Sequence, residues 1–219
     1  MEKIRMTPPV ITTSQLPLLR GDHVYLSFAT EADREPLRPL AKDDRIWEFT
    51  QTLMVTDTYD AQFDGYFDGA LATVSQGQAF VIRRSDTGTI LGMTRIHSYT
   101  PKDRWAEIGH TWYLPSVWGQ VHNKECKLLL LQFLFEQKGL CRVQFRVAHQ
   151  NLRSQKAVAK IGGTKEGILR KHGFRNDGQR KDTVVFSIID DEWPEKKAAL
   201  QALIASYAST SPSAHPTPR

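Results

Sequence analysis

The 219-residue chain has few cysteines and no long hydrophobic run, and both absences exclude classes of protein. Cys126 and Cys141 are the only thiols, so a small secreted fold held together by a framework of disulfides is excluded. The longest apolar run, residues 128–135, is interrupted by Gln132 and is far shorter than the roughly 20 residues that span a bilayer. The first residues also lack the apolar stretch of a secretory signal. The sequence therefore predicts a cytoplasmic protein that does not enter a membrane.

Signatures of several cofactor and metal sites are missing as well. The chain has no Gly-x-Gly-x-x-Gly motif, no Walker A loop and no Gly-x-Ser-x-Gly elbow. Its seven histidines include no pair spaced four residues apart, and neither cysteine belongs to a Cys-x-x-Cys pair. We therefore expect no metal site.

Charge is present, but it is unevenly distributed. The formal net charge is +5, and twelve of the 29 basic residues lie between Lys138 and Lys181, beside only Glu166 and Asp177. Residues 42–68 carry seven acids against two bases. The basic stretch suggests an anionic ligand or nucleic acid, and the acidic stretch suggests a cationic partner. Two solvated faces are the simpler alternative.

The length and the alternation of apolar residues indicate one domain over residues 21–207, after a flexible arm (1–20) and before a disordered tail (208–219). Strands are expected at residues 24–28, 79–83, 89–99, 105–114, 141–148, 164–172 and 183–189. Helices are expected at residues 33–40, 57–76, 124–138, 151–162 and 193–207. This order predicts an α/β (α+β) fold with a mixed seven-stranded sheet and helices on both faces.

Two turns could hold an anionic ligand. Residues 118–123 lead into a helix, and the free backbone N–H groups at a helix N-terminus form an anion site. Asn151 and Ser154 begin the next helix, where Asn151 is either an N-cap or a ligand contact. Both places could equally be structural turns.

Several motifs in this order resemble the GNAT superfamily of acyl-CoA-dependent N-acetyltransferases, in its RimJ/RimL-like branch. They are Asp33-x-x-x-Leu37, Thr87-Gly88, Ala106-Glu-Ile-Gly-His-Thr-Trp112, Asn123-Lys-Glu-Cys-Lys127, Asn151-Leu-Arg-Ser154, Glu166-Gly-Ile-Leu-Arg170 and Asp191-Glu-Trp-Pro194. The resemblance implies a sheet splayed between strands 105–114 and 141–148, with acetyl-CoA in the wedge as cosubstrate. The cofactor-binding residues would be Trp118, Gly119, Gln120, Val121, His122, Asn123, Asn151, Arg153 and Lys156.

One residue departs from the pattern of this family. Val121 stands where the loop of the family has a second glycine, and a β-branched residue is unfavourable if the turn needs an unusual backbone. The departure predicts weakened, shifted or lost binding of CoA.

The resemblance also implies the reaction, in which a primary amine attacks the thioester directly. Glu107 would be the base, with His110 as the alternative, and Ser154 would protonate the leaving thiolate. Trp47 and Trp112 would bind the acceptor, which the acidic segment 42–68 would flank. A cationic amine fits that segment: a peptide N-terminus, a polyamine or an aminoglycoside-like molecule.

Two other readings stay open. A catalytically lapsed module could bind a ligand or RNA through the basic 138–181 face, although the few aromatic residues there make nucleic acid the weaker choice. A succinyl donor would instead require Arg or Lys near the acyl tail. A homodimer is also expected from the resemblance.

Overall fold

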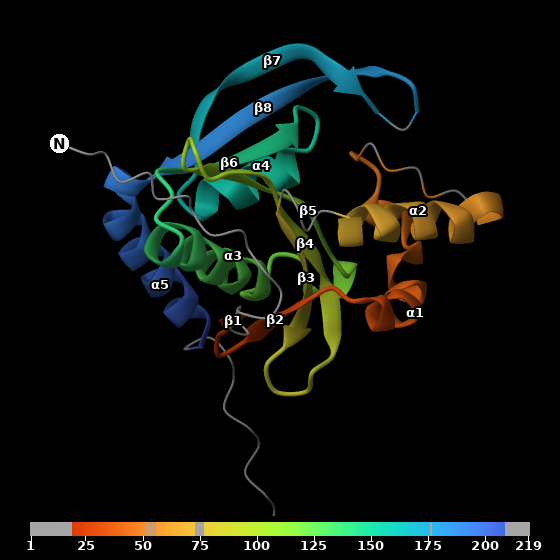
Figure 1. Cartoon of the computed structure of the whole chain (residues 1–219), viewed down its shortest axis with the longest axis horizontal. Coiled ribbons are helices and arrows are strands. Elements are labelled where there is room, and N and C mark those ends of the chain that lie inside the picture. Colours follow the sequence, from red (N-terminus) through yellow and green to blue (C-terminus); the bar gives the residue numbers. More distant parts are fainter. Residues whose placement is uncertain are drawn as a thin grey trace, which may run out of the picture.

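The computed structural model describes residues 19–50, 52, 54, 56–72, 77–175 and 177–208 (Figure 1). The predicted arm and tail lie outside these ranges, apart from Leu19, Arg20 and Ala208.

A single mixed sheet forms the centre of the described part. Its strands are β1 (Leu19–Arg20), β2 (Val24–Phe28), β3 (Gln78–Arg84), β4 (Ile90–Thr100), β5 (Trp105–Tyr113), β6 (Arg142–Ala148), β7 (Thr164–Phe174) and β8 (Arg180–Ile189). They lie in the order β1-β2-β3-β4-β5-β6-β8-β7. The sequence predicted seven of these eight strands. The eighth is β1, whose two residues pair with Leu26 and Tyr25 and are too few to show any alternation.

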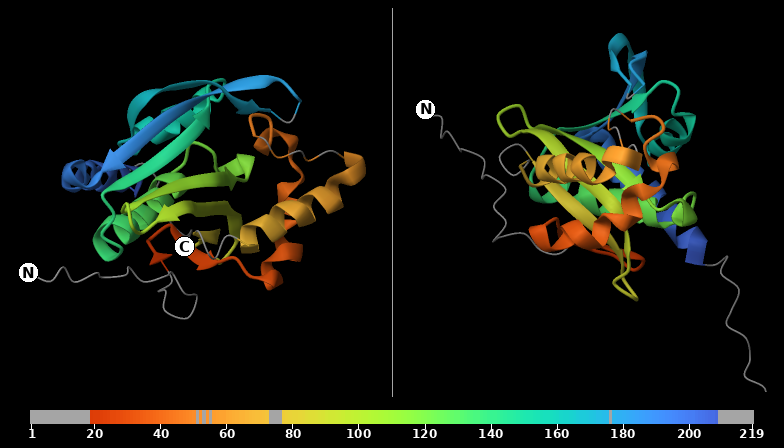
Figure 2. Two further views of the ribbon diagram at one scale, coloured as in Figure 1. Left: turned by 45° about the horizontal axis from the view of Figure 1, so that its top comes forward. Right: turned by 90° about the vertical axis from the view of Figure 1, so that its right-hand side faces the viewer.

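The sheet is antiparallel except at its centre, where β5 and β6 run parallel. That pairing covers only three positions, from Trp105 opposite Arg142 to Glu107 opposite Gln144. Beyond Glu107 the two strands separate, so β2–β5 and β6–β8 form two diverging halves (Figure 2). The splayed sheet expected from the resemblance is confirmed.

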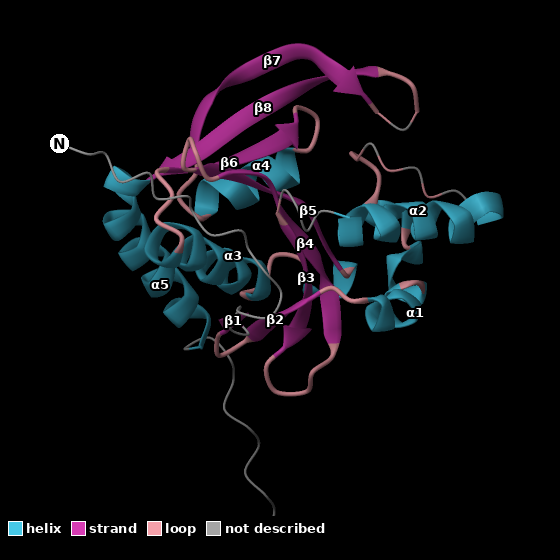
Figure 3. Ribbon diagram, viewed as in Figure 1, coloured by secondary structure: helices cyan, strands magenta, loops and turns pink. Residues whose placement is uncertain are grey.

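Helices cover both faces of the sheet (Figure 3). One side carries α1 (Arg34–Leu37) and α2 (Tyr59–Leu71), and the other carries α3 (His122–Gln132) and α5 (Trp193–Ala208), while α4 (Leu152–Lys160) follows β6. The helix predicted over 33–40 is mostly short 3₁₀ turns around a four-residue α1, because Pro36 and Pro39 supply no backbone donors. The helix predicted over 124–138 begins at His122 and ends in a π-helical turn, Phe133–Gln137.

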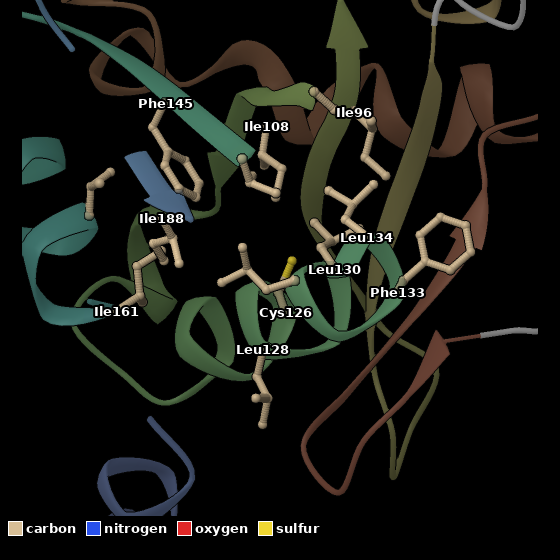
Figure 4. Close-up of a cluster of buried hydrophobic side chains, with 14 of the residues drawn as sticks. Ile96, Ile108, Cys126, Leu128, Leu130, Phe133, Leu134, Phe145, Ile161 and Ile188 are labelled. Atoms are coloured by element: carbon tan, nitrogen blue, oxygen red, sulfur yellow. The ribbon is translucent and has the colours of Figure 1, made fainter. Parts of the chain in front are cut away.

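Two apolar clusters hold these layers together. The larger lies between α3 and the sheet, where Leu130, Leu134 and Ile108 meet (Figure 4). The smaller lies between α2 and the opposite face, around Phe63 and Met93. Since both faces of the central strands are covered, the wedge between β5 and β6 is the place where the sheet itself can admit a ligand.

Candidate active site

A cavity of about 420 Å³ occupies the wedge. Its walls come from β5, β6, the first turns of α4, the segment that contains Trp47, and the β7–β8 hairpin. The backbone of β5 beyond Glu107 has no β6 partner, so a strand edge with free N–H and C=O groups faces this space. An extended ligand that carries amide groups can pair with such an edge.

Ten of the residues proposed from the sequence line this cavity. They are Glu107, His110, Ser154, Trp118, Gly119, Asn123, Asn151, Arg153, Trp47 and Trp112. Four others do not: Lys156 is exposed on α4, Gln120 bonds the Ser116 carbonyl, and Val121 and His122 are buried at the start of α3.

Glu107 is a buried carboxylate that is already engaged by its neighbours. Its Oε2 lies 2.6 Å from Nε of Arg146 and accepts from Nε2 of Gln144 at 3.3 Å, while Oε1 lies 3.4 Å from Nε2 of His97. Burial alone would raise the pKa of Glu107, but the hydrogen bonds from His97 and Arg146 outweigh it and hold the pKa below its usual range. The carboxylate is therefore a weak proton acceptor.

His110 is placed by an irregularity in the strand. The register between β4 and β5 shifts after Met93, and His110 adopts a φ of 48°, so its side chain is turned into the cavity. Its ring lies 5.1 Å from that of His97, edge to face. Although the ring is open to the cavity, the enclosing protein lowers its pKa to about 4, helped by the charge of Arg95. His110 is therefore a neutral imidazole at neutral pH.

Two residues of the site were missed from the sequence. His97 lies on β4 and shows no distinctive spacing with Glu107 or His110; only the pairing of β4 with β5 brings them together. Lys127 does show a signal, because it interrupts the apolar face of a helix that is otherwise buried.

Lys127 reaches the cavity wall from α3, although the residue is only 5% exposed. Its Nζ donates to Oγ1 of Thr111 at 2.7 Å and to Oγ1 of Thr94 at 3.2 Å. It forms no ion pair with any residue that the structure describes. Burial lowers its pKa to about 8. An ammonium group is thus held beside the β5 irregularity without a counter-charge.

The mouth of the wedge lies between the loop 118–123 and α4. The guanidinium of Arg153 stacks 3.5 Å above the ring of Trp118, whose Nε1 bonds the Tyr113 carbonyl at 2.9 Å. Asn151 caps α4 by accepting from the backbone N–H of Ser154 at 2.9 Å. This is the N-cap role, one of the two alternatives expected for Asn151.

The backbone of this loop is unusual at Gly119 and ordinary at Val121. Gly119 has a φ of 79°, a conformation that favours glycine, and a side chain there would meet no neighbouring atom. Val121 has φ −66° and ψ −30°, which any residue adopts at a helix start. The strain expected at Val121 is absent, because the helix begins at His122, two residues earlier than predicted, and Val121 already has a helical backbone.

An aromatic wall closes the other side of the cavity. Trp112 donates from Nε1 to the hydroxyl of Tyr66 at 3.0 Å, and the Trp47 ring lies 5.2 Å from Tyr66 and 6.0 Å from Trp112. His172 and Lys181 of the β7–β8 hairpin complete this side.

Segment 42–68 lines the cavity through apolar and neutral residues such as Trp47, Phe49 and Tyr66, whereas none of its acidic residues is a lining residue. That the segment flanks the acceptor site stays a prediction. Asp64 pairs with Arg34 and Arg38, and Asp68 pairs with Arg34, at the surface of α1 and α2. The charges of Asp64 and Asp68 are balanced by these ion pairs. The basic stretch is likewise partly paired, as between Arg142 and Glu166.

In the described ranges, no three His, Cys, Asp or Glu side chains come close enough together to hold a metal ion. No helix in the same ranges has the length and apolar character needed to cross a membrane.

Comparison with known proteins agrees with this geometry. Residues 23–164 match the family profile described as the acetyltransferase (GNAT) domain. The Bacillus subtilis protein YoaA, an uncharacterized N-acetyltransferase, is 27% identical over 182 residues, which is 79% of this chain and 97% of YoaA.

Two solved structures share the fold. A GCN5-related N-acetyltransferase from Brucella melitensis superposes with a TM-score of 0.79 at 24% identity, covering 91% of this chain and 90% of that one. Mycobacterium smegmatis RimJ, in complex with CoA-disulfide, superposes with a TM-score of 0.71 at 21% identity, covering 82% and 88%. The splayed sheet, the cavity at its divergence and the match over most of the domain lead to one conclusion: the chain belongs to the GNAT acetyltransferase family.

Proposed function

We propose that this protein transfers an acetyl group from acetyl-CoA to a primary amine, either a protein N-terminus or a small-molecule amine. The observation that carries the proposal is the cavity between β5 and β6, which meets a free strand edge on one side and a helix N-terminus at its mouth.

The donor would lie along the free edge of β5. The amide groups of its pantetheine arm can pair with the unpaired backbone beyond Glu107. Its pyrophosphate would be bound by the loop 118–123, where α3 begins, with Arg153 nearby at the mouth. That the similarly folded RimJ is found with a CoA compound supports this assignment.

The chemistry needs an unprotonated amine and a donor for the developing oxyanion. A backbone N–H at the β5 irregularity can hold the oxyanion. An α-amine, with a pKa of about 7.7–8, costs only about 1–1.4 kcal/mol to deprotonate at pH 7, whereas a lysine side chain costs about 4.6 kcal/mol. A weak acceptor therefore suffices for an α-amine.

His110 fits the role of that acceptor better than Glu107 does. With a pKa of about 4 its imidazole is also a weak base, but it is neutral and faces the cavity, whereas the carboxylate of Glu107 is occupied by Arg146, Gln144 and His97. Glu107 then orients these three neighbouring side chains. Ser154 lines the same cavity and would donate its hydroxyl proton to the leaving thiolate.

The test is a steady-state assay that follows CoA release with acetyl-CoA and two kinds of acceptor. We expect turnover with free α-amine peptides and little with peptides whose only amine is a lysine side chain. His110→Ala should lower kcat by about 10²-fold or more, the usual weight of a positioned proton acceptor. Thr87→Ala, on the exposed β3–β4 turn, is the control and should leave turnover unchanged. Absence of acetyl transfer to every amine would refute the proposal.

A cytoplasmic location and a homodimer remain predictions. The mass of the protein in solution tests the second.

A further inference from the structure

The charged side chains that line the cavity are mostly basic. Among the residues that line it, four have basic side chains, namely Lys127, Arg146, Arg153 and Lys181. Glu107 is the one carboxylate among these described lining residues. Arg153 lies at the mouth and Lys127 lies on the α3 side, whereas Arg146 and Lys181 come from β6 and β8.

Arg146 uses only part of its guanidinium within the protein. Its Nε is bound to Glu107 at 2.6 Å, and this contact fixes the orientation of the planar group. The two terminal nitrogens form no hydrogen bond with any described residue, and 36% of the side chain is exposed. Two parallel N–H donors thus remain available to a planar or tetrahedral anion.

Lys181 approaches the same space from β8. Ala148 of β6 pairs with Thr183 of β8, so Lys181 lies two residues beyond the last pair, on the side of the sheet that Thr183 faces. Its ammonium has no ion-pair partner within the described ranges, although the side chain is half-buried. Arg146 and Lys181 line the same cavity. Burial lowers the pKa of Lys181, and the charge of Arg146 lowers it further.

Arg146 already shares its charge with Glu107, whereas Lys181 has no counter-ion among the described residues. The repulsion between the two cations and the partial desolvation of Lys181 both fall when an anion binds to them. The aromatic side chains of Trp47, Tyr66 and Trp112 stand in the same cavity and offer an apolar surface. Asp64 and Asp68 of the acidic segment are paired elsewhere, with Arg34 at α1 and α2.

We propose that the amine acceptor carries a carboxylate or phosphate group, bound by Arg146 and Lys181, beside an apolar part that packs on the aromatic wall. This inference rests on the proposed acetyl transfer, and it replaces the cationic acceptors suggested by the acidic segment. Glu107 is then a positioning residue, because it holds the guanidinium of Arg146 by Nε and leaves the terminal nitrogens free.

The test uses two dipeptide amides, Phe-Glu-amide and Phe-Gln-amide. They share the same α-amine and nearly the same shape, and they differ by one negative charge. Binding is measured by calorimetry on protein saturated with CoA, and acetyl transfer is measured separately with acetyl-CoA. The variants are Lys181→Gln and, as the matched control, Lys165→Gln, which removes an exposed lysine of β7 outside the cavity.

We expect the Glu peptide to bind about tenfold more tightly than the Gln peptide, the weight of one partly buried charge-assisted contact. The preference should fall to about twofold or less in Lys181→Gln and persist in Lys165→Gln. Equal binding of the two peptides, or no binding of either, would overturn the anionic acceptor. Acetyl transfer to both peptides at equal KM would also overturn the anionic acceptor, but it would leave the proposed function intact. A binding preference without any acetyl transfer would instead refute the proposed function.

Discussion

At the scale of single residues, the clearest feature is a buried charge that destabilises the folded state. Lys127 is buried against Thr94 and Thr111, and its pKa of about 8 lies below the ordinary value because burial penalises the charged form. Below pH 8 the folded protein therefore carries an ammonium group that would be better solvated in the unfolded chain. A residue kept at such a cost, at the wall of the cavity, belongs to the function rather than to the stability of the protein.

Lys127→Met should make the protein more stable. The shift of the pKa corresponds to about 3 kcal/mol at pH 7, so the variant should gain up to that amount in free energy of unfolding. The folded pKa is lowered, so the unfolded state binds more protons between about pH 8 and 10.5, and the stability of the wild type rises over that window. The gain of the variant should shrink accordingly. Urea unfolding at pH 7 and pH 10 measures both effects.

An unchanged or lower stability of Lys127→Met at pH 7 would show that the ammonium is not destabilising. The matched control is Lys102→Met, an exposed lysine in the turn after β4, which should change the stability by no more than about 0.5 kcal/mol.

At the scale of elements, one carboxylate joins α3 to the first strands. Glu125 accepts from the backbone N–H groups of Asp22, His23 and Val24 at 3.0, 2.7 and 2.6 Å. The residue is buried, and Gly21 leaves room for it, since a methyl group there would lie 2.5 Å from its carboxyl carbon. The carboxylate thus accepts the hydrogen bonds of three backbone N–H groups in the turn between β1 and β2 and at the start of β2.

Glu125→Ala should lower the free energy of unfolding by about 2–4 kcal/mol, because three backbone donors, one of them buried and two partly buried, lose a charged acceptor. Glu195→Ala, on the exposed first turn of α5, is the control and should change it by less than about 0.5 kcal/mol. Urea denaturation followed by circular dichroism distinguishes the two, and equal small effects would mean that this turn needs no cap.

The loop before α3 gives a second prediction at this scale. Val121 has a helical backbone and is buried, so Val121→Gly should leave acetyl-CoA affinity within about twofold and lower the stability by about 1 kcal/mol. Gly119→Ala should instead weaken acetyl-CoA binding, because φ 79° disfavours a side chain. Calorimetry on both variants tests this assignment, and tighter binding by Val121→Gly would contradict it.

At the scale of the whole molecule, periodicity was enough to predict the main strands and helices, because each is a local pattern. It could not predict β1, which exists only through its pairing with β2. The site was predictable where chain neighbours form it, as at Trp118 and Gly119. His97 was not predicted, because only the pairing of β4 with β5 in the folded sheet brings it beside Glu107. For the acidic segment, the sequence shows how many charges there are and not that Asp64 is paired with arginines of α1 and its flank.

The central claim is that the wedge between β5 and β6 binds acetyl-CoA. The most direct measurement is calorimetric titration of the protein with acetyl-CoA, beside a Ser154→Phe variant whose larger side chain would fill the cavity from the first turn of α4. We predict micromolar binding with one site per chain in the wild type, and at least about tenfold weaker binding in the variant at unchanged stability. Absence of binding in the wild type, or equal binding by both proteins, would contradict the account.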